Sequence, residues 1–263
     1  MAIAVNLSHV PRGMIDRVLV ILNTFDRGHE QQRLTDISRR CGLPLATTYR
    51  ILQRLAVWGM LERTVDGNYQ IGLRLWELGS LAPRSMELQH IARPFMHDLH
   101  TVTGFTVHLG IREGEEMVSV ERFVSPAQRK RRPLLVGRRN ALHTTAIGQV
   151  LLAYAPTDVQ EQVLAGPLTP VTPYTCTDPR ELRRMLERIR DQGYAISDRQ
   201  INLTQIGVAA PVYAHGTGPI AALSVMTDLG LASTTSMTQA VRVTAAGITR
   251  ALRQATAHHL TVS

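Results

Sequence analysis

The spacing of apolar residues near the start of the chain predicts a first helix. Its apolar positions recur at intervals of mostly three or four residues and so share one face: Ile15, Val18, Leu19, Leu22 and Phe25. This spacing is typical of an amphipathic helix that packs on a core, and Gly28 would end it.

Two shorter helices are predicted next, separated by a glycine. Thr35 can cap the first of them, and Gly42 breaks it. Pro44 suits the first turn of the second helix. The inward positions of the two helices are Ile37, Cys41, Thr48, Ile51, Leu52 and Leu55. Two short helices joined by a tight turn containing glycine form a helix-turn-helix.

A hairpin is predicted directly after these helices. Residues 60–65 and 68–71 flank Asp66-Gly67, a dipeptide that favours a two-residue hairpin turn. Three helices followed by a hairpin is the element order of a winged helix-turn-helix. A small helical bundle with an unrelated hairpin is the alternative, but it does not account for the polar outer face of the third helix.

That outer face carries five candidate DNA contacts: Thr47, Tyr49, Arg50, Gln53 and Arg54. Basic and hydrogen-bonding side chains on a helix that enters the major groove suit base edges and phosphates. We expect Thr47, Tyr49 and Arg50 to contact bases, with Arg50 able to pair with guanine. Phosphate contacts are expected from Arg39, Arg40 and Arg54. A solvated surface arginine is the alternative for each of them.

The remainder of the chain alternates between helical and strand patterns. Helices are predicted at 73–81, 88–102, 144–154, 179–192 and 237–257, and strands at 105–111, 117–123, 134–136, 195–197, 208–213 and 220–226. Strands in hairpins surrounded by helices predict an α+β domain. We expect three parts: a winged helix-turn-helix over 1–72, a linker helix over 73–87, and an effector-binding and oligomerisation domain over 88–263.

Charge supports a polyanionic partner without proving one. The net charge is +8, and a cluster of basic residues falls within the predicted helix-turn-helix. A second basic run, 129–132, is expected to be a solvated loop, with an oligomer contact or effector site as the alternative. No apolar run is long enough for a membrane helix. Cys41 and Cys176 lie far apart in the sequence and do not form a spaced pair, so we expect them to be reduced. The first residues do not resemble a signal peptide, and we expect a cytoplasmic protein.

The sequence shows none of the common enzyme patterns. A Gly-x-Ser-x-Gly elbow, a Walker loop and a dinucleotide-binding glycine pattern are all missing. His97 and His100, like His258-His259, lack the cysteine or carboxylate spacing that completes a zinc site. We expect His143 to anchor a turn by hydrogen bonding. We therefore expect no catalytic residues, no cofactor and no metal.

Five blocks, in order along the chain, resemble the IclR family of bacterial regulators. They are CGLPLATTYRILQRLAVWGMLER, GNYQIGLRLWELGSLA, VGRRNALHTTAIGQVLLAYAP, DQGYAISDRQINLTQIGVAAPVY and GPIAALSV. The first resembles the family's helix-turn-helix, the second its wing and linker helix, and the third its Pro-Leu-His segment. The last two resemble the blocks near its effector pocket. Ala46, Thr48 and Gln149 depart from the residues usual in the family, so base preference cannot be transferred.

The resemblance implies a GAF-like fold for the larger domain and an effector pocket within it. Matched position by position, the implied effector-binding residues are Ala146, Ile147, Ser197, Gly207, Ser224 and Met226. These residues imply a pocket that is roomier or more apolar than one for a small dicarboxylate or keto acid. We expect a small carboxylic acid, aromatic acids included. Aliphatic acids, hydrazides, sugars or no effector at all are the alternatives.

The resemblance also implies a homodimer or homotetramer that binds a partly palindromic double-stranded operator. Paired linker helices would set the spacing of the two recognition helices. Two other classes remain open: an enzyme with a regulatory DNA-binding domain, and a nucleoid-type DNA binder without an effector. Turnover of a ligand would indicate the first, and equal affinity for all DNA sequences the second.

Overall fold

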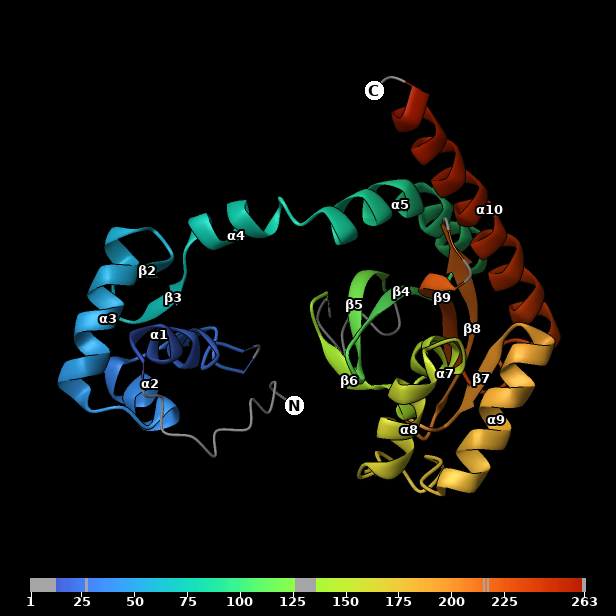
Figure 1. The fold of residues 1–263 in the computed structure, drawn as a ribbon, viewed down its shortest axis with the longest axis horizontal. Coiled ribbons are helices and arrows are strands. Elements are labelled where there is room, and N and C mark those ends of the chain that lie inside the picture. Colours follow the sequence, from blue (N-terminus) through green and yellow to red (C-terminus); the bar gives the residue numbers. More distant parts are fainter. Residues whose placement is uncertain (1–12, 27, 126–135, 215, 217, 262–263) are drawn as a thin grey trace. The chain divides into compact units, whose positions relative to one another are not determined.

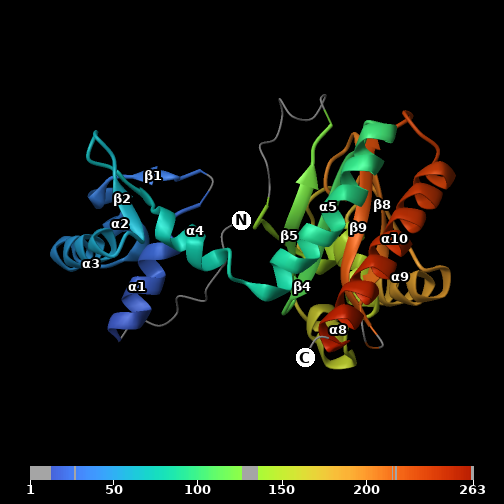
Figure 2. The same ribbon diagram turned by 90° about the horizontal axis from the view of Figure 1, so that it is seen from above.

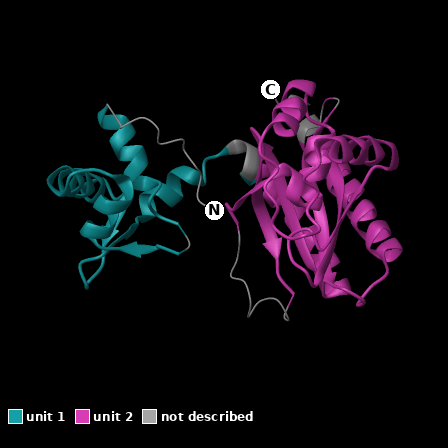
Figure 3. Ribbon diagram, turned by 90° about the horizontal axis from the view of Figure 1, so that it is seen from below, with its two compact units in different colours: residues 1–86 teal, residues 87–263 magenta. Residues whose placement is uncertain are grey.

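The computed structural model describes residues 13–26, 28–125, 136–214, 216 and 218–261. The chain forms two compact units, residues 1–86 and 87–263 (Figure 3). Each unit has its own hydrophobic core, and we describe them separately.

The first unit is a winged helix-turn-helix (Figure 2). Its elements are α1 (Met14–Leu22), β1 (Gln31–Gln32), α2 (Leu34–Cys41), α3 (Leu45–Val57), β2 (Leu61–Arg63), β3 (Tyr69–Ile71) and α4 (Leu73–Gly79). The strands form an antiparallel sheet in the order β1-β3-β2. The core lies between the helices and this sheet, with Ile37, Leu52 and Tyr69 fully buried. The predicted order of helices and hairpin is confirmed, whereas β1 was not predicted.

Several predicted details of this unit are wrong. The first helix ends at Leu22, well before Gly28. Ile15 and Leu19 were assigned to its inward face but are exposed, and Ile21 is the fully buried residue. Helix α2 begins at Leu34 with Arg33 in the cap position, so Thr35 lies inside the helix and does not cap it. The residue pattern favoured a threonine cap, but α2 begins without a side-chain cap hydrogen bond.

The second unit is an α+β domain around one six-stranded sheet (Figure 1). Its strands are β4 (Thr106–Glu113), β5 (Glu116–Phe123), β6 (Arg139–Ala141), β7 (Ala195–Asp198), β8 (Gln205–Tyr213) and β9 (Pro219–Asp228). They are antiparallel and lie in the order β6-β5-β4-β9-β8-β7. Strands β4 and β9, which are far apart in sequence, pair at the centre of the sheet.

Helices cover both faces of this sheet. Helix α5 (Pro83–Thr103) and helix α10 (Thr234–Thr261) pack on one face against a core that includes Leu109, Leu223 and Val225. The opposite face is covered by the 3₁₀ turn η1 (Leu142–Thr144) and by α7 (Ala146–Ala153), α8 (Thr157–Ala165) and α9 (Pro179–Gln192). Residues that alternate along each strand therefore belong to two different cores.

Helix α7 lies very close to its surroundings, and two glycines make this possible. A Cβ atom on Gly148 would lie 2.3 Å from the carbonyl oxygen of Leu142. A Cβ atom on Gly110 of β4 would lie 2.8 Å from Met117 Sδ and 2.9 Å from Ile147 Cγ2. Only the absence of a side chain at these positions lets backbone and helix approach this closely.

The connection between the units differs from the prediction. A linker helix over 73–87 followed by a helix over 88–102 was expected. Instead α4 ends at Gly79 and α5 runs from Pro83 to Thr103, so the break falls near residues 80–82. Helix α8 and strand β6 were not predicted. The predicted strand 134–136 and the basic run 129–132 lie outside the described residues, apart from Val136, which is in a turn.

Candidate DNA-binding surface and ligand pocket

Helix α3 presents its predicted polar face to the outside of the first unit. Tyr49 is 47% exposed, and Arg50 and Arg54 are also exposed. Thr47 and Gln53 are half-buried. The opposite face is anchored by Thr48, Ile51 and Leu52, all of which are buried. The packing of this inner face leaves the predicted contact residues available on one side of the helix.

Three of the predicted contacts, Arg39, Arg40 and Gln53, already have partners within the unit. Gln53 Nε2 lies 3.2 Å from the hydroxyl oxygen of Tyr69, which joins α3 to the wing strand β3. Arg39 Nη2 lies 2.8 Å from Asp36 Oδ1 in an exposed ion pair on α2. Exposed pairs of this kind contribute little stability, so Arg39 can exchange Asp36 for another anion at small cost.

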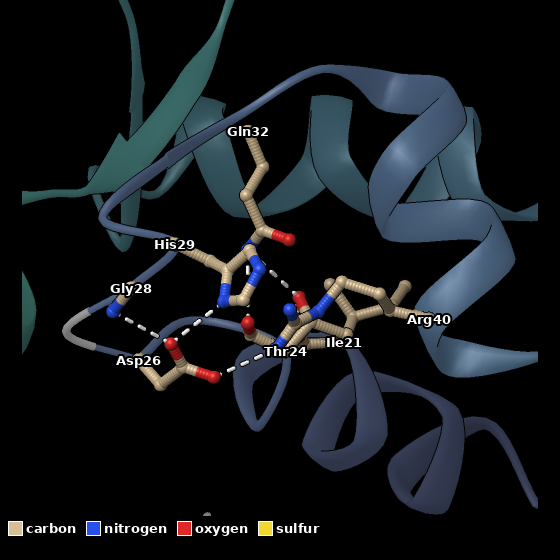
Figure 4. A network of polar contacts seen from close by, with 7 residues as sticks. All are labelled: Ile21, Thr24, Asp26, Gly28, His29, Gln32 and Arg40. Carbon is tan, nitrogen blue, oxygen red and sulfur yellow. Dashed lines mark hydrogen bonds and ion pairs between the residues drawn. The ribbon is translucent and has the colours of Figure 1, made fainter.

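Arg40 has a different environment from the other predicted contacts (Figure 4). It is half-buried, and its Nη2 lies 2.7 Å from Asp26 Oδ2. Asp26 Oδ1 also accepts hydrogen bonds from His29 Nδ1 at 2.8 Å and from the Gly28 main-chain N–H at 2.9 Å. Arg40 therefore fixes the loop after α1, and this geometry argues against its predicted role as a phosphate contact.

The same network controls the ionisation of Asp26. Partial burial by itself would raise the pKa of this carboxyl group. Hydrogen bonds from His29, Gly28 and Arg40 outweigh it and lower the pKa to about 2. Asp26 is therefore ionised at neutral pH and holds Arg40 in place.

All six residues implied as effector-binding line one cavity in the second unit: Ala146, Ile147, Ser197, Gly207, Ser224 and Met226. The void measures about 80 Å³, several times the roughly 10–15 Å³ that a single water needs. Its other lining residues are His108, Met117, Ser119, Arg122, Arg138, Asn140, Thr145 and Ile201. The structure thus brings the six positions together, from four separate parts of the chain.

Strand register explains how the six positions meet. Ser197, Gly207 and Met226 lie side by side on β7, β8 and β9. In the next row of the sheet, Ser224 of β9 faces His108 of β4. Helix α7 begins above these rows, and Ala146 and Ile147 form its first turn. The cavity therefore lies between the sheet and the N-terminal end of α7.

A bulge in β5 adds two further residues to the cavity. Leu109 pairs with Glu121, but the next residue, Gly110, pairs with Ser119, which leaves Val120 without an opposite residue. Because of this extra residue, Ser119 and Arg122 both line the cavity although they are three positions apart. Bulges of this kind commonly direct side chains at functional sites.

The polar lining is positively charged. His108 Nε2 and Ser119 Oγ lie 2.7 Å apart and share a hydrogen bond. Burial, together with the positive charges of Arg122 and Arg138, lowers the pKa of His108 to about 3. His108 is therefore neutral at physiological pH, while the two guanidinium groups remain charged. None of the described residues that line the cavity is acidic.

The start of α7 reinforces this positive potential. Thr145 Oγ1 caps the helix by accepting a hydrogen bond from the Gly148 main-chain N–H at 2.9 Å. The N-terminal end of a helix carries a partial positive charge that favours anions. The apolar part of the lining consists of Met117, Ala146, Ile147, Ile201 and Met226. Such a cavity suits an anion attached to an apolar body.

Six polar residues of the cavity were missed by sequence analysis: His108, Ser119, Arg122, Arg138, Asn140 and Thr145. His108, Ser119 and Arg122 fall within predicted strands, where period-two alternation indicates only which residues share a face. The bulge changes that alternation, and nothing in the local sequence marks it. Arg138 closely follows the basic run 129–132, for which an effector site was only the alternative to a solvated loop.

The other histidines have structural environments. His143 Nε2 lies 3.1 Å from the carbonyl oxygen of Thr169, which agrees with the predicted role of anchoring a turn. His97 and His100 both contact the ring of Phe123. The side chains of His258 and His259 lie outside the described residues. Among described residues, no group of three His, Cys, Asp or Glu could hold a metal ion, and no described helix is long and apolar enough to span a membrane.

Comparison with known families decides the identity of both units. Residues 14–64 match the IclR helix-turn-helix domain, and residues 81–250 match the bacterial transcriptional regulator IclR C-terminal domain. The chain belongs to the IclR family. The fold class and the family predicted from the sequence are therefore confirmed.

Related proteins support this assignment over most of the chain. The regulator XynR of Escherichia coli is 33% identical over 81% of this chain and 85% of its own length. The repressor AllR of Salmonella typhi is 31% identical over 80% of this chain and 78% of its own. This IclR-family protein is thus a DNA-binding transcription regulator, and its family is not known for enzymes.

Solved structures of relatives share the fold. An IclR homologue from Microbacterium hydrocarbonoxydans, in complex with 4-hydroxybenzoate, is 33% identical with a TM-score of 0.87, covering 92% of this chain and 100% of that one. The Thermotoga maritima IclR is 26% identical with a TM-score of 0.71, covering 91% of this chain and 98% of its own.

Proposed function

We propose that this IclR-family regulator senses a small, aromatic carboxylic acid in the cavity beneath α7, and that binding changes its affinity for operator DNA. One observation carries this proposal. The cavity is lined by two arginines, Arg122 and Arg138, and by apolar side chains, and none of its described lining residues is acidic. A carboxylate can form charge-assisted hydrogen bonds with guanidinium groups, and an apolar ring fits the remaining surface.

The cavity suggests how such a ligand would lie. Its carboxylate would face Arg122, Arg138 and the start of α7, with its ring against Ile147 and Met226. Gly207 leaves space beside Met226, since a Cβ atom there would meet nothing closer than 3.7 Å. The 4-hydroxybenzoate bound by the Microbacterium homologue supports an aromatic acid as the ligand class.

On the DNA side, we propose that Thr47, Tyr49 and Arg50 contact bases while Arg54 and Arg39 contact phosphates. Gln53, which lies beside the wing, would also contact the DNA. Residues 1–72 would bind DNA, 73–87 connect the domains, and 88–263 bind the effector and other subunits. Such a regulator would act on operators in the cytoplasm.

We further propose a homodimer or homotetramer on a partly palindromic operator. Helix α4 supports this assembly, because Leu73 is 60% and Trp76 is 68% exposed. Large apolar residues exposed along one short helix commonly mark a protein contact. A two-fold assembly would present two copies of α3 to two half-sites.

The test combines DNA binding with ligand binding. Fluorescence anisotropy would compare DNA from upstream of the protein's own gene with scrambled DNA of equal length, at two salt concentrations. We expect tighter binding to the first DNA and a change in that affinity on adding 4-hydroxybenzoate. Equal, salt-sensitive binding to both would argue against specific recognition at that site.

Calorimetry separates the carboxylate from its alternatives. We expect heat of binding with 4-hydroxybenzoate and none with the uncharged 4-hydroxybenzamide, which has the same shape. Short aliphatic acids would test the need for a ring. Binding of the amide alone would overturn the carboxylate proposal and favour a non-carboxylate effector.

A further inference from the structure

We propose that Glu121 connects the effector cavity to helix α5 and so transmits ligand binding toward the DNA-binding unit. The inference rests on the proposed function, since it assigns a route to the response of that same cavity. It is carried by a buried carboxylate whose two oxygens contact two different elements.

Glu121 and Arg122 are neighbours in sequence but face opposite sides of the sheet. Arg122 lines the cavity, whereas Glu121 contacts α5 on the other face. The β5 bulge lies directly before them, at Val120. Glu121 is 8% exposed, and a carboxylate at this depth requires hydrogen-bond partners in fixed positions.

The first carboxylate oxygen of Glu121 bonds to the strand. Its Oε1 accepts a hydrogen bond from the main-chain N–H of Arg122 at 2.8 Å. Strand β6 pairs with β5 at Glu116, Met117 and Val118, before this point is reached. The carboxylate therefore holds the backbone of the residue whose side chain faces the ligand.

The second oxygen bonds to α5. Glu121 Oε2 accepts a hydrogen bond from Gln89 Nε2 at 3.0 Å, and Arg93 Nε lies 3.7 Å from the same oxygen. Helix α5 contains the boundary between the two units, which falls between Met86 and Glu87. Gln89 thus lies on the first turn of α5 beyond that boundary.

These contacts make one continuous connection from the cavity to the helix that joins the units. An acid that draws the Arg122 guanidinium toward itself changes the position of the Arg122 backbone beside the bulge. Glu121 must then move with it or lose a hydrogen bond, and Gln89 is bonded to the same carboxylate. Effector binding and DNA binding are coupled if the arrangements of Arg122, Glu121 and Gln89 with and without ligand differ in stability.

The decisive variant is Gln89→Leu, which removes the hydrogen bond from α5 to Glu121, keeps the volume similar and leaves the longer Arg93–Glu121 ion pair at 3.7 Å. With 4-hydroxybenzoate as the probe, we expect the parent to show an operator-affinity change within the roughly 5- to 150-fold range of allosteric coupling. In Gln89→Leu the change should fall to less than about twofold, with ligand still bound in calorimetry. Glu87→Gln, at an exposed position of the same helix, should respond like the parent.

A second variant guards against loss of folding. Gln89→Leu combined with Glu121→Leu removes both partners, which avoids leaving a buried carboxylate without its donor. We expect this double variant to bind operator and ligand without a response of one to the other. A full response in either Leu variant would overturn the proposal.

A measurement without ligand keeps this inference separate from the choice of effector. Amide hydrogen exchange at Arg122 should be at least about tenfold faster in Gln89→Leu than in the parent, since the carboxylate that accepts this N–H loses its support. Glu87→Gln should leave it unchanged. Unchanged exchange in Gln89→Leu would overturn the connection, whether or not 4-hydroxybenzoate proves to be bound.

Discussion

The two faces of the six-stranded sheet are built from the same strands yet differ in composition. The face toward α5 and α10 is filled by large aliphatic side chains such as Leu109, Leu223 and Val225. The face toward α7 carries small residues, among them Ala209 and Ala222, beside the polar lining of the cavity. Large side chains of the sheet fill the first face, while the second face leaves space for a ligand. Four experiments test this difference between the two faces.

The largest expected effect is a loss of stability from a change on the face toward α5 and α10. Leu223→Ala should lower the free energy of unfolding by about 2–5 kcal/mol, because Leu223 is fully buried and its loss leaves a void. Its neighbour Ser224→Ala, which changes the cavity face, should cost less than about 1.5 kcal/mol. Urea unfolding of both variants measures the difference. Equal losses would show that the two faces contribute alike.

Removing a charge from the cavity, on the face toward α7, should affect ligand binding more than folding stability. Arg122→Met should weaken 4-hydroxybenzoate binding about 10- to 100-fold, since hydrogen bonds to charged groups contribute about 1.5–3 kcal/mol. Arg112→Met is a matched control, because Arg112 on the neighbouring strand bonds to Gly114 and does not line the cavity. Calorimetry gives both affinities, and equal loss in the two variants would contradict the assigned role of Arg122.

Replacement by alanine should affect stability differently at two glycines on the face toward α7. A Cβ atom has room at Gly207 but would press on Met117 and Ile147 at Gly110. We expect Gly110→Ala to cost about 1–3 kcal/mol of stability through overpacking, and Gly207→Ala clearly less. Gly207→Val should narrow the cavity and weaken ligand binding about tenfold. A similar melting temperature for the two alanine variants would argue against this distinction.

The last effect concerns the dependence of stability on pH. Folding lowers the pKa of His108 from 6.5 to about 3, so the unfolded chain binds more protons between these values. His108 therefore contributes to stability above pH 6.5, and this contribution is lost as the pH falls toward 3. Asp26, whose pKa is also lowered, acts in the same direction below pH 3.8.

His108→Gln should flatten the dependence of stability on pH between 6.5 and 4, measured by urea unfolding at several pH values. Asp26 remains unchanged in this variant and serves as the internal reference below pH 3.8. A pH profile identical to that of the parent would show that His108 is not the responsible group.

The first unit was largely predictable because its pattern is local. Thr48, Ile51 and Leu52 recur along one helix, so their spacing alone determines which face is buried and which residues are left outside. Arg40 shows where this reasoning ends. Its partner Asp26 lies 14 residues away, across a loop, and no local spacing relates the two.

The cavity was predictable only in part, for a related reason. The six implied residues came from family resemblance, and strand register then explains why they meet. Arg122 could not be found in this way, because the bulge at Val120 reverses the expected alternation. The break between α4 and α5 falls near residues 80–82, earlier than the gap between the helices predicted at 73–81 and 88–102, since residues on both sides have helical patterns.

The row formed by Ser197, Gly207 and Met226 has a consequence for evolution. These residues occupy adjacent strands, on the face of the sheet opposite the aliphatic core that contains Leu223 and Val225. Mutations in this row can accumulate with little penalty for folding, so descendants of one regulator can come to recognise ligands of different length while keeping the same scaffold. A laboratory selection for new biosensors would start by randomising these three positions.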